Sequence, residues 1–94
     1  MTRVESLNFL ADVLDQVSTS TKAEATALID GMPSAIHPEV LVVLANVSHY
    51  VADYDIRAVD DDYARIQERE LQNLISALRR GDSLDALLEF SLIP

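Results

Sequence analysis

Residues 38 to 53 read PEVLVVLANVSHYVAD, a segment that is apolar on almost every side. Pro38 suits the first position of a helix, because the backbone N–H that proline lacks would have no helical partner there. The β-branched residues of the segment also permit a buried strand, but the proline start and the length beyond Tyr50 favour a helix. A helix that is apolar all round lies at the centre of a protein or in a subunit interface.

The rest of the chain also favours helices. Neither Gly nor Pro lies between Glu39 and Arg80, and aromatic residues make up only 5% of the chain. The chain has no Asn-Gly pair, and its Asp-Gly pair, Asp30-Gly31, stands at the end of a helical pattern and does not mark a hairpin. We therefore predict an all-α bundle without a sheet, formed by a single domain over residues 1–94.

Capping residues predict where the helices begin and end. Thr2 and Thr21 are each followed three residues later by a glutamate, which is the spacing of a capping box. Gly31 and Gly81 are placed to take the left-handed conformation that ends many helices. These signals predict four or five helices, at 3–17, 22–30, 38–53, 61–80 and 83–91. We favour a break near 54–59, and the alternative is that the third and fourth helices are joined through 53–60.

Composition excludes several classes of protein. The 94 residues include 16 Asp and Glu against 7 Lys and Arg, which gives a net charge of −9. With 49% hydrophobic residues the chain is not a disordered acidic tail, and it lacks the basic balance of a nucleic-acid binder. Without cysteines, a signal peptide or a long apolar run, we expect a cytoplasmic protein that does not contact membrane.

The sequence predicts no catalytic, cofactor or metal site, and therefore no enzymatic activity. The two histidines, His37 and His49, lack the paired spacing of metal ligands, and the two glycines lie too far apart to form a phosphate loop. Asp82-Ser83-Leu84 resembles the phosphopantetheine attachment motif of acyl carrier proteins, which implies a prosthetic arm on Ser83. Carrier proteins place that serine near mid-chain, whereas eleven residues follow Ser83, so we favour a helix N-cap.

A dense acidic cluster consists of Asp53, Asp55, Asp60, Asp61 and Asp62. It does not match a calcium loop, because the sixth position from Asp53 is Ala58 and the twelfth is Ala64. We interpret the cluster as helix capping and solvated surface. The alternative is an acidic patch that recognises a basic partner.

Function is therefore expected on surfaces. One small bundle cannot easily enclose both the apolar third helix and the apolar C-terminal residues, so we predict a two-fold homodimer. The candidate interface residues are Val40, Val43, Val47, Tyr50, Val51, Tyr54, Phe90, Leu92 and Ile93. We expect a non-enzymatic regulator or adaptor that acts by protein–protein interaction. The alternative is an acidic inhibitor, an immunity-type protein or a DNA mimic that blocks a basic partner, and its binding would weaken steeply with salt.

Overall fold

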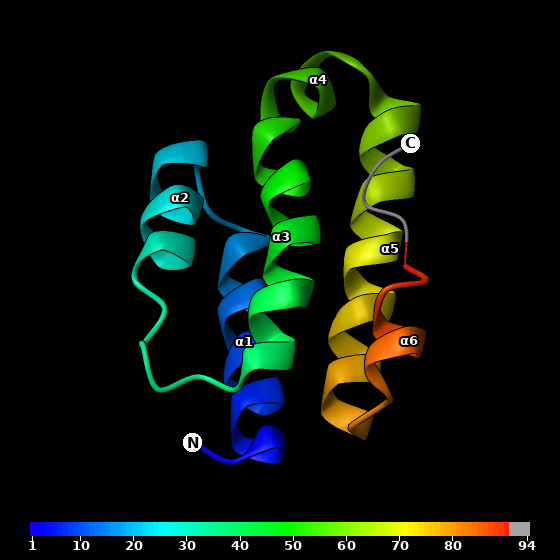
Figure 1. The fold of residues 1–94 in the computed structure, drawn as a ribbon. Coiled ribbons are helices and arrows are strands. Elements are labelled where there is room, and N and C mark those ends of the chain that lie inside the picture. The colour runs from blue at the N-terminus through cyan, green and yellow to red at the C-terminus, as the bar shows by residue number, and fades with distance from the viewer. Residues whose placement is uncertain (91–94) are drawn as a thin grey trace.

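The computed structural model describes residues 1–90, and within them it contains helices and no strand (Figure 1). The prediction of an all-α bundle is confirmed. Three helices, those at 3–17, 22–30 and 61–80, have the predicted bounds. The helix predicted at 38–53 ends one residue earlier than predicted. In chain order the helices are α1 (Arg3–Val17), α2 (Lys22–Asp30), α3 (Pro38–Ala52), α4 (Tyr54–Val59), α5 (Asp61–Arg80) and α6 (Leu84–Leu87).

Two predictions of helix extent are wrong. Residues 54–59 were expected to be a break, but they form the short helix α4, and the chain leaves helical geometry on either side of it, at Asp53 and Asp60. The last helix was predicted over 83–91, but α6 covers only Leu84–Leu87. The Leu88 N–H still bonds to the Leu84 carbonyl four residues back, but the Glu89 N–H bonds to the Ala86 carbonyl three residues back, so the helical pattern ends here.

Both predicted capping boxes are present. The hydroxyl of Thr2 accepts a hydrogen bond from the Glu5 N–H at 3.1 Å, and the Glu5 carboxylate accepts one from the Thr2 N–H at 3.1 Å. Thr21 and Glu24 make the same pair of bonds at the start of α2. The bond from the Thr2 N–H is the main cause that holds the pKa of Glu5 below its usual range. The pKa of Glu24 is lowered chiefly by the Thr21 hydroxyl, which donates to the Glu24 carboxylate at 2.8 Å.

The two glycines end their helices in different ways. Gly81 has φ 74° and ψ 34°, the left-handed conformation predicted for it. The same prediction for Gly31 is wrong, because its φ is −85° and its N–H bonds to the Ala27 carbonyl at 3.0 Å. The chain after α2 therefore leaves through an ordinary turn that does not require a left-handed residue.

The core lies between α1, α3 and α5. α1 and α5 pack against each other, α3 contacts both α1 and α2, and α6 covers one end of α3 and α5 (Figure 1). Each long helix turns one row of branched aliphatic residues inward, and burying each such side chain stabilises the fold by about 1.5–3 kcal/mol. The largest fully buried aliphatic side chains are Leu7, Leu10, Leu14, Val40, Val43, Val47, Leu71, Leu74, Leu78 and Leu87.

No helix within residues 1–90 combines the length and the apolar character needed to cross a bilayer.

Candidate functional site

The helix α3 has an inner and an outer side. Val40, Val43 and Val47 lie on the inner side and are at most 1% exposed. On the opposite side Leu41 is 52% exposed and Val42 is 46% exposed. No Asp, Glu, Lys or Arg lies between Val40 and Ala52, so this side has no fully charged group. We call it the α3 outer face, and it consists of the exposed residues Leu41, Val42, Ala45, Ser48, His49 and Ala52.

A groove between α2 and α3 borders the α3 outer face. Its cavity has a volume of about 370 Å³. Ser48 and Ala52 belong both to the groove and to the outer face, so the two form one continuous surface. α2 and α6 lie beside α3, and Leu88, directly after α6, is 38% exposed. The residues that line this α2–α3 groove are Lys22, Thr26, Ile29, Asp30, Ser48, Val51 and Ala52.

The predicted interface residues lie mostly elsewhere than predicted. Five of them are 0–9% exposed within the single chain and pack in its core: Val40, Val43, Val47, Tyr50 and Val51. The prediction that these five side chains face a partner is therefore corrected. Tyr54 is half-buried beside Arg57, and Phe90 is half-buried against the core. Leu92 and Ile93 lie outside the described residues.

The α3 outer face could not be identified from the sequence alone, because an apolar segment does not itself show which side faces inward. A weak signal was available in the polar residues. Ser48 and His49 lie on the exposed side of α3 together with Leu41 and Ala45. Polar residues within an apolar helix mark the side that core packing leaves outside.

The acidic cluster is divided among different intramolecular contacts. Asp60 caps α5 by accepting a hydrogen bond from the Tyr63 N–H at 3.0 Å. Asp55 pairs with Lys22 at 3.3 Å, and Asp62 pairs with Arg65 one turn later on α5. Asp61 is exposed in the first turn of α5, where a carboxylate suits the positive end of the helix dipole.

Asp53, the fifth residue of the cluster, belongs to a hydrogen-bonded network that joins α3, α4 and α5. One oxygen of Asp53 accepts bonds from the Tyr63 hydroxyl at 2.5 Å and from the Gln67 amide at 3.0 Å. The Gln67 carbonyl oxygen accepts a bond from Arg57 at 2.6 Å. Burial and, next, the hydrogen bond to Asp53 raise the pKa of Tyr63 to about 12. We call Asp53, Arg57, Tyr63 and Gln67 the polar corner.

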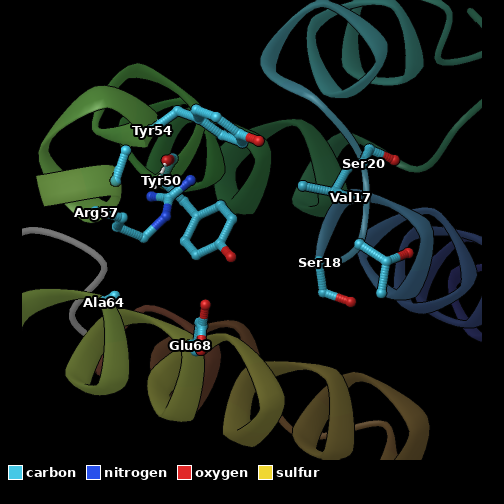
Figure 2. A pocket seen from close by; sticks show the side chains of 10 residues that line it. Val17, Ser18, Ser20, Tyr50, Tyr54, Arg57, Ala64 and Glu68 are labelled. Atoms are coloured by element: carbon cyan, nitrogen blue, oxygen red, sulfur yellow. Dashed lines mark hydrogen bonds between the residues drawn. The ribbon is translucent and has the colours of Figure 1, made fainter. Parts of the chain in front are cut away.

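A second cavity, of about 300 Å³, opens beside the polar corner. Figure 2 shows the side chain of Arg57 between Tyr50 and Tyr54, with Glu68 pointing toward them from α5. The guanidinium carbon of Arg57 lies 3.6 Å from the centre of the Tyr50 ring and 5.5 Å from that of Tyr54. The loop after α1 forms the far wall with the hydroxyl residues Ser18, Thr19 and Ser20.

Two residues weighed for chemistry act as helix caps. The Ser83 hydroxyl accepts a hydrogen bond from the Ala86 N–H at 3.3 Å, as expected for the N-cap of α6. The ring Nδ1 of His37 accepts one from the Glu39 N–H at 3.2 Å, which caps α3. Over residues 1–90, no three His, Cys, Asp or Glu side chains gather in a group that could hold a metal ion.

The chain was compared with protein-family models, with curated proteins and with solved structures, and none of them matches it.

Proposed function

We propose that this protein is a small non-enzymatic regulator or adaptor that self-associates through the α3 outer face. The observation that carries the proposal is the exposure of Leu41 and Val42, each about half in solvent, on a helix side without a charged group. Burying the exposed part of such side chains against a second surface is favourable by about 1 kcal/mol each. An apolar patch of this kind is typical of protein–protein contact sites.

The net charge of −9 favours a contact made through this face. Two copies of an acidic chain repel each other, and the repulsion is strongest where carboxylates meet at short distance. The α3 outer face places no carboxylate at the centre of such a contact. Its alanines and Ser48 are small, so a second helix can approach closely, and helix separation depends on the side chains at the contact.

The size of the contact indicates which neighbouring segments take part. A helix of 15 residues is about 22 Å long, and a stable interface buries about 800 Å² on each partner. One helix side is smaller than that area. We therefore include the α2–α3 groove in the proposed interface, since it shares Ser48 and Ala52 with the α3 outer face. A two-fold dimer would present every remaining surface in pairs, which raises the avidity for a further partner.

The test compares charge substitutions at two equally exposed positions. Leu41→Glu adds a carboxylate to the α3 outer face, whereas the control Ile66→Glu adds one at a side chain of α5 that is 50% exposed. Sedimentation velocity should show wild type and the Ile66 variant as dimers and the Leu41 variant as a monomer, with the same circular dichroism for all three. Dimers of equal stability in both variants would contradict the proposal.

A further inference from the structure

Arg57 differs from the other cations of this acidic chain. Five of the seven Lys and Arg side chains pair with a carboxylate: Arg3, Lys22, Arg65, Arg79 and Arg80. Within residues 1–90, Arg57 and Arg69 make no such pair. Arg69 is exposed on α5, whereas Arg57 is half-buried in the wall of the 300 Å³ cavity. A half-buried guanidinium that is not paired directly with a carboxylate can form strong charge-assisted hydrogen bonds with a ligand anion.

The position of Arg57 is held by its neighbours. Its Nη1 donates to the backbone carbonyl of Tyr50 and to the side-chain amide oxygen of Gln67, the latter at 2.6 Å. The flat face of the guanidinium lies on the Tyr50 ring. The guanidinium has five N–H donors. Those on Nε and Nη2 make no hydrogen bond within the described chain. Because the group is already ordered, a ligand that binds these donors does not have to immobilise the side chain.

Glu68 supplies the opposite charge to the same cavity. It is exposed on α5, points toward Tyr50 and Arg57 in Figure 2, and forms neither a hydrogen bond nor an ion pair within residues 1–90. Burial raises the pKa of Tyr50, while Arg57 lowers it and Glu68 raises it, so both charges are felt at the Tyr50 ring. The cavity therefore carries a cation and a carboxylate that are not ion-paired with each other.

The wall opposite α4 adds hydrogen-bond acceptors. The hydroxyls of Ser18, Thr19 and Ser20 all donate to backbone carbonyls at the end of α1. Their protons are engaged in this way, so the oxygens are left with lone pairs that can accept. Acceptors of this kind, together with a carboxylate, suit an ammonium group.

We propose that this cavity binds a compact zwitterion with one carboxylate and one ammonium group, the class to which the free α-amino acids belong. The carboxylate binds the free donors of Arg57, the ammonium binds Glu68, and the rest of the ligand packs against the ring of Tyr54. A simple anion would be repelled by Glu68 and a simple cation by Arg57, so neither uses the whole site. The volume of about 300 Å³ is at the small end of ligand pockets.

The first experiment uses the full chain labelled with ¹⁵N and the common α-amino acids, added one at a time to millimolar concentration. For at least one of them we expect saturable chemical-shift changes at Tyr50, Tyr54, Arg57 and Glu68, and none on the α3 outer face. The same compound without its ammonium, or with its carboxylate amidated, should bind about tenfold more weakly. No saturable change with any amino acid would overturn the proposal, as would equally tight binding of the carboxylic acid alone.

The second experiment uses variants. Glu68→Gln removes a charge that makes no hydrogen bond or ion pair within residues 1–90, and we expect about tenfold weaker binding of the amino acid. Its matched control is Glu70→Gln, which lies on the same helix outside the cavity and should bind like wild type. Unchanged affinity in the Glu68 variant would overturn the assignment. Binding by the Leu41→Glu variant, which tests self-association, should equal that of wild type, so the two proposals can fail separately.

Discussion

Gln67 is a buried polar residue, 1% exposed, within the otherwise apolar inner side of α5. Its amide links Asp53 to Arg57, so that both charged groups are hydrogen-bonded at the corner between α4 and α5. A buried polar side chain is tolerated when its bonds are made and is costly when a partner is removed. The polar corner therefore determines how α4 turns the chain from α3 into α5.

Replacement of Gln67 tests that role. Gln67→Leu keeps a similar side-chain volume but removes the hydrogen bonds that Gln67 makes to Asp53 and to Arg57. We expect the free energy of unfolding to fall by about 2 kcal/mol. Urea denaturation followed by circular dichroism measures the change. Gln72→Leu, at an exposed position of the same helix, is the control and should stay near wild type. An equal effect of the two substitutions would show that the polar corner does not stabilise the fold.

The raised pKa of Tyr63 makes stability depend on alkaline pH. The hydroxyl titrates near 10.0 in an unfolded chain and near 12 in the fold, so the folded state holds this proton more tightly. The resulting stabilisation is complete below pH 10 and is lost as the pH rises toward 12. We expect the difference in unfolding free energy between wild type and Tyr63→Phe to shrink over that interval in urea titrations. A difference that is constant with pH would refute the link between Tyr63 and Asp53.

At the scale of the element, Gly81 is the residue that ends α5. Its φ of 74° is rare for residues with a Cβ, although no atom lies within 4 Å of where a Cβ would be. The cost of a substitution is therefore conformational rather than steric. Gly81→Ala should lower the free energy of unfolding by about 1–2 kcal/mol. Gly81→Asn should cost less, because Asn tolerates the left-handed region. Thermal denaturation of the two variants measures this difference, and a lower stability of Gly81→Asn than of Gly81→Ala would contradict it.

The helix α2 depends strongly on its cap. It has nine residues, fewer than the roughly 12–15 that an isolated helix needs, and only Ala25 is buried. Thr21→Ala removes the hydroxyl of the capping box and should cost about 1 kcal/mol. Hydrogen exchange should then speed up in α2 and stay unchanged in α5. Faster exchange in both helices would mean that α2 opens only together with the whole fold.

The helices also show what a sequence can predict. The starts of α1, α2 and α5 depend on residues within one turn, such as Thr21 with Glu24, and all three were predicted correctly. Which side of α3 faces the core depends on contacts with helices that lie far away in the chain. The α3 residues predicted to face a partner therefore lie on the side that faces the core. α4 is six residues long and is held by the contact of Arg57 with Gln67, which no local pattern shows.

In the whole molecule, charged side chains have partners that lie far apart in the sequence. The acidic cluster was recognised in the sequence, but its partners were not, because Lys22 lies 33 residues from Asp55. The cavity at Arg57 was missed altogether, since its walls come from α1, α3, α4 and α5 and from the loop after α1. By contrast, the α3 outer face contains no Asp, Glu, Lys or Arg, and this property is the basis of the proposed self-association.

The most direct test of the proposed self-association is the solution mass of the unmodified chain. It is measured by light scattering after size-exclusion chromatography in a dilution series. We expect twice the chain mass of 10.4 kDa at micromolar concentration, with dissociation toward 10.4 kDa on dilution. Raising the salt concentration should not dissociate the dimer, because the α3 outer face at the centre of the proposed contact contains no Asp, Glu, Lys or Arg. A mass of 10.4 kDa throughout the micromolar range would contradict the proposal that the chain self-associates through the α3 outer face.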